Sequence, residues 1–244
     1  MSEKEFDMVG IPSAGLLYDH PELKNKEALE VFYMTTRHED ILTSPNLMAS
    51  GEVLDVLLKS IMVNKKIDVH NLLPGDRDAI LVWARATGFG ADYTFSIKCP
   101  ACGSVQEDTM NLNEIGIISL DENETFEFKM PLSGKIVKFG FITYGQQKEI
   151  SDTIARKKKK LKVKIDDRTT LTLLQSIKAV DGDSEPDSIR KFVNKMRPGD
   201  SRALLKHTAD KEPRLDMSYD FECAECSHIE RESSVPVTVS FWWN

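Results

Sequence analysis

The 244-residue chain lacks a long uncharged apolar run, so its sequence predicts no membrane-spanning helix. Such a helix needs about 20 consecutive apolar residues. The strongest apolar candidate, residues 235–244, has only 10 residues and alternates like a strand. The opening residues 1–7 are acidic and contain no apolar segment, so no secretory signal is expected. These absences predict a soluble protein made in a cytoplasm.

Sequence signatures of catalysis are also missing. The chain contains no P-loop, no Rossmann glycine pattern, no H-E-x-x-H and no G-x-S-x-G. His38-Glu39-Asp40 resembles an acid–base cluster, but carboxylates are also typical of helix starts, where they stabilise the helix dipole. We prefer the helix start. Catalytic sets can be dispersed along a chain, yet nothing here suggests one, and we expect a non-enzyme without a small-molecule substrate.

Cysteine is scarce, and the four that occur form two C-x-x-C pairs: Cys99 with Cys102, and Cys223 with Cys226. In a reducing compartment such pairs indicate a metal site before disulfides. Each C-x-x-C turn directs two sulfurs toward one point, and the small residues Ala101 and Gly103 let backbone amides approach the thiolates. Four thiolates make a closed structural zinc site with no position for a catalytic water. We predict one structural Zn²⁺ per chain, held by these cysteines.

Other interpretations of the cysteines stay open. A thioredoxin-type redox pair opens a helix that lowers the thiol pKa, whereas residues 104–110 have an extended pattern and the motif occurs twice. Knuckles without metal and an iron–sulfur cluster are further alternatives. His228, two residues beyond Cys226, could replace one ligand, although an exposed turn histidine is the simpler interpretation.

The two cysteine pairs are 124 residues apart, whereas common zinc ribbons separate their knuckles by about 15–20. The same offset of 124 separates Pro74-Gly75-Asp76 from Pro198-Gly199-Asp200. Weaker sequence matches occur in the same order in both halves; residues 57–61, for example, resemble residues 173–177. Because Pro-Gly-Asp is a common helix start, chance similarity is the alternative. We predict an internal duplication with halves 1–122 and 123–244, related by a pseudo-twofold axis and clamped together by the zinc.

The hydropathy pattern predicts an α+β fold in which each half has a β-hairpin, central helices and a strand–knuckle–strand ribbon, the two ribbons meeting at a zinc-ribbon-like site. Alternation on both sides of Ser133-Gly134 predicts a hairpin over residues 125–141. Apolar residues at helical spacing predict helices over 53–61 and 171–178. Period-2 alternation predicts strands over 93–97 and 235–239.

Two segments are candidate partner-binding sites. The basic run 156–164 has seven basic residues in nine and includes Lys157, Lys158, Lys159 and Lys160. It could contact phosphates or an acidic partner, and a solvated helix end is the alternative. Nucleic acid is not the main partner expected, because the net charge is −7. Neighbouring strand residues face opposite sides, so Trp242 and Trp243 cannot share one core, and one of them could anchor a partner.

Five segments carry a resemblance to a known family: 12–18, 34–44, 57–61, 73–81 and 93–102. They resemble the baseplate hub proteins of T4-like contractile-tailed bacteriophages, the group of hub subunits and hub assembly catalysts. The resemblance covers mainly residues 9–105, and the second half shows weaker similarity to the same family.

The resemblance implies a phage-encoded, non-enzymatic protein of tail baseplate morphogenesis. Its partners would be phage tail and baseplate hub proteins, in the host cytoplasm during assembly and then in the virion tail baseplate if it is retained. Two alternatives stay open. One is a zinc-ribbon adaptor that binds nucleic acid or the transcription machinery through the basic run, and the other is a thiol oxidoreductase.

Overall fold

The computed structural model describes residues 5–120, 125–161 and 166–243, and of residues 160 and 161 it describes the backbone alone. They form a mixed helix-and-strand fold, as predicted, in two compact units. The first unit comprises Met1–Val69, Gly75–Ile118 and Pro213–Asn244. The second unit comprises His70–Pro74 and Ser119–Glu212.

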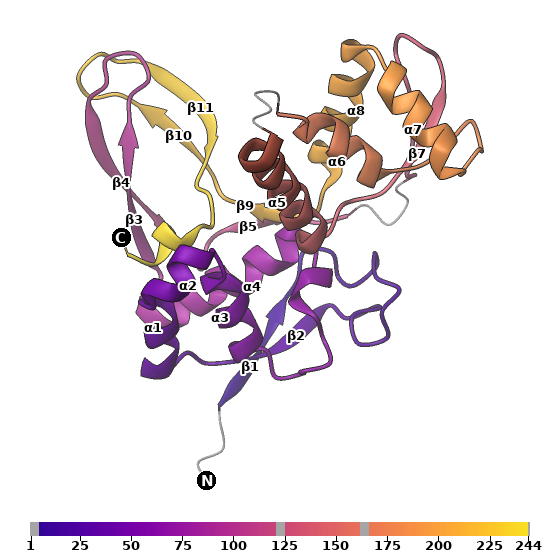
Figure 1. The fold of residues 1–244 in the computed structure, drawn as a ribbon. Helices are drawn as coiled ribbons and strands as arrows, with labels where there is room; N and C mark the ends of the chain where they lie inside the picture. The colour runs from indigo at the N-terminus through magenta and orange to yellow at the C-terminus, as the bar shows by residue number, and fades with distance from the viewer. Residues whose placement is uncertain (1–4, 121–124, 162–165, 244) are drawn as a thin grey trace. The chain divides into compact units, whose positions relative to one another are not determined.

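Within its described residues, the first unit combines α-helices of 6 to 16 residues with three antiparallel strand pairs, β1–β2, β3–β4 and β10–β11 (Figure 1). A fourth pair, β5–β9, joins the two places where the chain leaves the first unit and returns to it. The elements are β1 (Phe6–Gly10), β2 (Ala28–Phe32), α1 (Thr36–Leu42), α2 (Pro45–Ser50), α3 (Val53–Ile61), α4 (Pro74–Phe89), β3 (Asp92–Lys98), β4 (Val105–Asn111), β5 (Gly116–Ile118), β9 (Arg214–Asp216), β10 (Ser218–Glu222), β11 (Ile229–Ser234) and η2 (Val239–Trp242). The short η1 (Val69–Asn71) begins in the first unit and ends in the second.

The helical core of the first unit follows from apolar spacing. Helix α3 repeats its apolar residues at intervals of three and four, so Leu57, Leu58 and Ile61 share one fully buried face. Ile80 and Leu81 of α4 are also fully buried. Helix α3 is the helix that the sequence predicts over residues 53–61.

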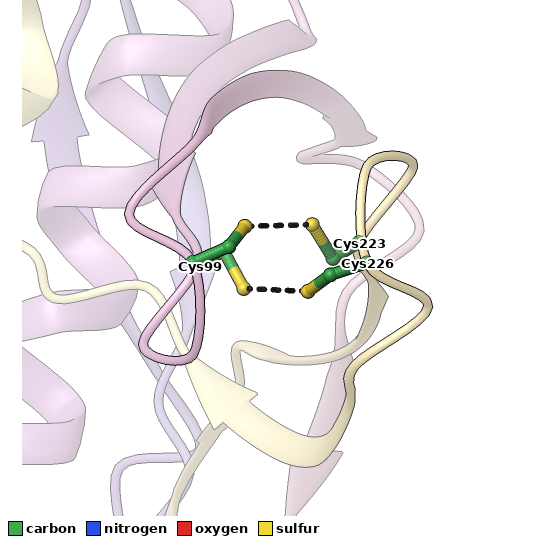
Figure 2. Close-up of side chains that lie close together, drawn as sticks. Cys99, Cys223 and Cys226 are labelled. Atoms are coloured by element: carbon green, nitrogen blue, oxygen red, sulfur yellow. Dashed lines mark hydrogen bonds between the residues drawn. The ribbon is translucent and has the colours of Figure 1, made fainter.

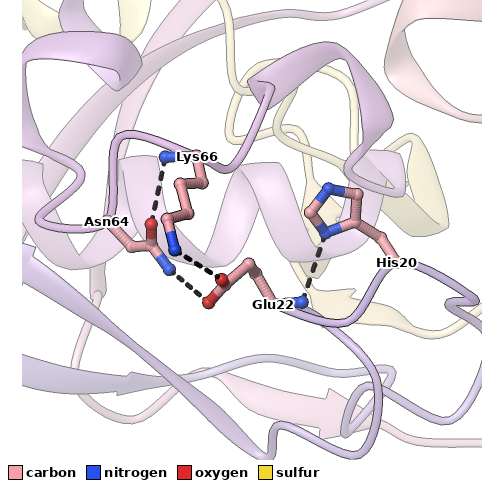
Figure 3. Close-up of polar contacts among 4 residues, drawn as sticks. All are labelled: His20, Glu22, Asn64 and Lys66. Carbon is pink, nitrogen blue, oxygen red and sulfur yellow. Dashed lines mark hydrogen bonds and ion pairs between the residues drawn. The ribbon is translucent and has the colours of Figure 1, made fainter.

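Polar contacts fix the long connection between β1 and β2 to the segment after α3 (Figure 3). The Glu22 carboxylate accepts a hydrogen bond from Asn64 Nδ2 at 2.8 Å and pairs with Lys66 Nζ at 3.4 Å. The Glu22 backbone amide donates to His20 Nδ1 at 3.2 Å. The Asn64 hydrogen bond and the Lys66 charge lower the pKa of Glu22. Lys66 is exposed, so this network orients the loop more than it stabilises the fold.

In the part of the chain that the structure describes, the second unit packs four helices with one antiparallel sheet of strand order β6-β7-β8. Its elements are β6 (Glu127–Lys129), β7 (Ile136–Phe139), α5 (Tyr144–Leu161), α6 (Arg168–Ser176), β8 (Ile177–Val180), α7 (Pro186–Lys195) and α8 (Pro198–Lys211). Strands β6 and β7 form the hairpin predicted over residues 125–141, and Gly134 in its turn has φ +70°. The buried core is Met130, Val137, Phe139, Leu173, Ile177, Val180, Ile189, Val193 and Leu204.

Packing divides the chain differently from the repeat that the sequence predicts. Residues 213–244 belong to the second predicted half, yet they lie in the first unit. Gly75 at the start of α4 packs closely against the beginning of this segment, since a Cβ atom on Gly75 would lie 2.1 Å from the Pro213 carbonyl oxygen. The predicted halves describe a repeat in the sequence, whereas the two units describe how the chain packs. The units therefore do not test the halves 1–122 and 123–244, which stay a prediction.

Two local predictions were wrong. Residues 235–243 form no strand, because Pro236 has no amide hydrogen for a strand ladder and η2 follows it. The Phe241 ring instead packs 4.5 Å from Tyr93, centroid to centroid. The helix predicted to reach Lys178 ends at Ser176, because β8 begins at the next residue and pairs with β7.

Helices α4 and α8 both begin with Pro-Gly-Asp, and each aspartate holds a distant loop. The Asp76 carboxylate is fully buried and accepts hydrogen bonds from Ser13 N at 2.9 Å, Ser13 Oγ at 2.5 Å and Tyr18 Oη at 2.6 Å. Asp200, 1% exposed, accepts the amides of residues 132 and 133 at 2.7 and 3.1 Å. Both aspartates thus serve tertiary structure, although the motif predicts helix caps.

We expect Asp76→Ala to lower the free energy of unfolding of the first unit by about 2–3 kcal/mol, because it leaves buried donors without an acceptor. All three tryptophans belong to the first unit, so urea unfolding followed by tryptophan fluorescence reports on it. The exposed Asp40→Ala is the control and should change the value by less than about 0.5 kcal/mol. Equal effects of the two variants would contradict this role of Asp76.

Candidate metal centre

The four cysteines meet in the first unit, at the turns of two strand pairs (Figure 2). Cys99 and Cys102 lie in the turn between β3 and β4, and Cys223 and Cys226 in the turn between β10 and β11. The four cysteine sulfur atoms all lie within 4.8 Å of one another. The Cys99 and Cys226 sulfurs are 3.7 Å apart, and those of Cys102 and Cys223 3.6 Å. The predicted meeting of the two pairs is confirmed.

These spacings fit a tetrahedral metal ion. Zn–S bonds are about 2.3 Å long, so two sulfurs of a tetrahedral site lie about 3.8 Å apart. The separations of 3.6 and 3.7 Å are close to that value and far from the S–S bond of about 2.05 Å in a disulfide. All four thiols are free of disulfides. The cluster can therefore hold a metal ion, and four thiolates suit zinc or iron.

The two cysteine turns have the same backbone hydrogen bonds. In the first, Cys99 N donates to Ser104 O at 2.8 Å and Gly103 N donates to Cys99 O at 2.9 Å. In the second, the same two bonds, of 2.9 and 2.8 Å, join positions 124 residues later. Gly103 and its counterpart Ser227 both have left-handed backbones, with φ +77° and +55°. Glycine adopts this conformation without strain, which fits the small residue after the first pair.

Contacts beside the cysteines hold the two strand pairs together. The Gln106 side chain of β4 donates from Nε2 to the Glu222 carbonyl at 3.1 Å and accepts from the Ala224 amide at 3.1 Å. The Phe95 ring of β3 packs edge-to-face on Tyr219 of β10, with centroids 4.9 Å apart. These contacts position the second cysteine turn against the first independently of a metal.

Ser104 favours ionised sulfurs at the centre. Its Oγ lies 3.1 Å from Cys102 Sγ and 3.2 Å from Cys223 Sγ. The hydroxyl contact lowers the pKa of Cys223 to about 6, and the Ser104 hydroxyl and backbone lower the pKa of Cys102.

Cys226 shows the opposite effect. A backbone hydrogen bond from His228 favours its thiolate, but the neighbouring sulfurs and burial outweigh it and raise the pKa of Cys226 to about 12. Four thiols so close together repel one another once several are ionised. A bound dication reverses that repulsion and deprotonates its ligands.

In metal-free protein, Ser104→Ala should raise the pKa of Cys223 from about 6 toward the ordinary thiol value of about 8.5, because the thiolate loses its hydroxyl donor. Less Cys223 is then thiolate at pH 7, and its alkylation slows. The measurement is the alkylation rate against pH, assigned by peptide mass spectrometry. Ser96→Ala on β3 is the control. A Cys223 that titrates near pH 8.5 in all three proteins would refute the role of Ser104.

The structure gives the candidate partner residues on α5 different surroundings. Lys157 and Lys158 form ion pairs with Asp167 and Asp166, the second at 3.4 Å. Lys159 is exposed, whereas the side chain of Lys160 lies outside the described residues. Two of these lysines therefore have acidic neighbours of their own, and partner binding by this run stays a prediction.

The C-terminal tryptophans also differ. Trp242 is 2% exposed, and its ring lies 5.9 Å from the Phe89 ring, whereas Trp243 is 46% exposed. The sequence predicts that the two cannot share a core, and their burial agrees. Of the two tryptophans, Trp243 is therefore the one whose side chain is exposed enough to contact a partner.

His38 belongs to the start of helix α1, the interpretation that the sequence favours. It is buried, and its Nδ1 accepts the Thr35 amide at 2.9 Å, which makes it the third-position member of a capping box. Sequence reasoning missed this contact because Glu or Gln usually occupies that position.

A comparison with protein families identifies the group to which the sequence is related. The model described as T4 bacteriophage base plate protein matches residues 26–241. The chain belongs to this family. The match includes both cysteine pairs and both Pro-Gly-Asp motifs, so the relationship extends well beyond the segments that carry the resemblance. Searches of curated proteins and of solved structures return no match. Among the described helices, none has the length and apolar character needed to cross a bilayer.

Proposed function

We propose that this protein is a non-enzymatic hub component or hub assembly factor of a contractile-tailed phage baseplate, and that it acts by binding other tail proteins. The observation that carries the proposal is the family match over residues 26–241. Base plate proteins act by contact with neighbouring proteins, which fits a chain whose strongest chemical feature is a closed cysteine cluster. A closed cluster supports structure, because it leaves no coordination position for a substrate or water.

We propose that the cluster binds one structural Zn²⁺ through Cys99, Cys102, Cys223 and Cys226. Support comes from the near-tetrahedral sulfur spacing and from the lowered pKa values of Cys102 and Cys223. The ion would join the turn between β3 and β4 to residues 213–244, across 124 residues of sequence. Zinc contributes about 10–16 kcal/mol of binding free energy in small finger peptides, so part of that would secure this connection.

We also propose that the two halves arose by internal duplication. The matched hydrogen bonds of the two cysteine turns support it, as does the equivalent use of Asp76 and Asp200 to hold the loops that begin near residues 13 and 132. The pseudo-twofold axis would then run through the metal, because equivalent turns supply its ligands.

For partner contact we propose Lys157–Lys160 and Trp243, with Trp242 fixing the segment from inside. Exposure of Lys159 and Trp243 supports this assignment. To bind an acidic partner, Lys157 and Lys158 would have to exchange Asp167 and Asp166 for the partner's carboxylates.

Native mass spectrometry on protein purified without chelator should give one zinc per chain. Cys223→Ser should lose the zinc and lower the thermal midpoint of the first unit, because three ligands hold the ion less tightly. The control is His228→Ala, which should keep the zinc if the four cysteines are the ligands. Wild-type protein without metal would refute the zinc proposal, and zinc loss in His228→Ala would assign a ligand role to that histidine.

The phage role is tested by an early stop codon in the gene, complemented in trans. Cells infected with the mutant phage should accumulate tail parts, and electron microscopy should show no complete baseplates. Wild-type protein supplied in trans should restore infectious particles. Mass spectrometry of purified tails then separates a retained hub component from an assembly factor. Normal baseplates without the protein would refute the role.

A further inference from the structure

The second unit is basic although the whole chain is acidic. It has 20 Lys and Arg against 15 Asp and Glu, a net charge of +5. The first unit has the remaining 12 and 24, a net charge of −12, so the total of −7 hides the basic character of the second. A basic unit attracts acidic partners, which raises the rate of encounter and selects the sign of charge that a partner carries.

The second unit has a pocket beside helix α7 whose lining is partly apolar. Its volume is about 450 Å³. The apolar lining consists of Val180 of β8, Phe192 of α7 and Met196, the residue after α7. Val180 is buried, whereas Phe192 and Met196 are half-buried and pack against the core of the unit. A cavity of this size with apolar walls is large enough to take in a side chain of a ligand.

Helix α7 also brings cations to this pocket. Four lining residues recur along α7 at intervals of three and four, which places them on one face of the helix. They are Ser188, Lys191, Phe192 and Lys195. Both lysines are exposed, and neither forms an ion pair with any residue that the structure describes. Like charges four residues apart on a helix repel each other, so an acidic ligand in contact with both would relieve that repulsion.

The other charged groups of the pocket already have partners within the unit. Lys135 forms an ion pair of 2.6 Å, and Arg197 donates to a backbone carbonyl at 3.1 Å. The Asp183 carboxylate accepts one backbone amide at 2.9 Å, and that of Asp200 accepts two, at 2.7 and 3.1 Å. The two lysines of α7 are therefore the charges that the pocket offers to a ligand.

We propose that this pocket binds an acidic segment of a partner protein that carries an apolar anchor side chain. The anchor would enter the cavity against Phe192 and Met196, and carboxylates beside it would pair with Lys191 and Lys195. A nucleic-acid duplex would offer phosphates to the lysines but no apolar side chain to the lining. The inference goes beyond the hub role, because the pocket selects its ligand by chemistry, whichever protein carries the segment.

Methyl NMR of the full-length protein, labelled at methionine, tests the proposal because Met196 reports from the pocket lining. The probe is a capped decapeptide of eight glutamates with two central phenylalanines. It should shift the Met196 signal saturably and leave unchanged the signals of Met8 and Met48, which are exposed in the first unit. Met196→Leu assigns the signal and keeps the lining apolar.

Two matched peptides separate the charge of the probe from its anchor. In one, serines replace the phenylalanines, and in the other, lysines replace the glutamates. Each should bind at least tenfold more weakly than the probe. A probe that leaves Met196 unchanged, or either matched peptide binding as tightly as the probe, would overturn the proposal.

Reversing the charge of the pocket identifies the lysines that bind. K191E/K195E should bind the probe at least tenfold more weakly than wild type, and should bind the lysine peptide more tightly than wild type does. R202E/K206E is the control, since it makes the same charge change at two exposed positions four residues apart on α8, outside the pocket lining. A loss in the control equal to that in K191E/K195E would show that only net charge matters, and would contradict the proposed site.

Two further results would assign the pocket to another occupant and overturn the proposal. A DNA duplex that shifts the Met196 signal and displaces the probe would assign it to nucleic acid. A Met196 signal that shifts with protein concentration alone, together with a sedimenting mass above one chain, would assign it to a second copy. Baseplate assembly in the stop-codon experiment is a separate measurement, so failure of the hub role and failure of this inference are distinguishable.

Discussion

The meeting of four thiols from two distant segments of the sequence is the constraint on which the first unit depends. Their sulfurs lie within 4.8 Å of one another although the two pairs are 124 residues apart. Neutral thiols gain little from such proximity, and thiolates repel, as the raised pKa of Cys226 shows. A bound cation would turn the arrangement into an attraction, and the cluster of all four cysteines could hold one.

The chain segment that returns to the first unit completes this cysteine cluster. Residues 119–212 of the second unit lie between β5 and β9, which pair with each other, so the chain returns to the first unit where it left. The returning segment supplies β10, β11 and the second cysteine turn. The cysteine cluster at the turns, which could hold a metal ion, and the Phe95–Tyr219 contact beyond it lie at two points along this segment.

Local chemistry made part of this structure predictable. The hairpin around Gly134, helix α3 and the cysteine turns follow from side-chain periodicity, turn residues and motif spacing, all read within a short window. The two C-x-x-C motifs predicted that the cysteine turns meet, but the assignment of all of residues 213–244 to the first unit could not be predicted, since it depends on contacts between distant segments. Asp76 illustrates the difference: its motif indicates a helix start, but its acceptor role is set by a loop 63 residues away.

Zinc X-ray absorption spectroscopy on the purified, full-length protein tests the central claim most directly, because it reports the atoms bonded to the ion. The account predicts four sulfur neighbours at about 2.3 Å and no nitrogen or oxygen in the first shell. A shell containing nitrogen or oxygen, or fewer than four sulfurs, would contradict the claim that the two cysteine turns together form one closed metal centre.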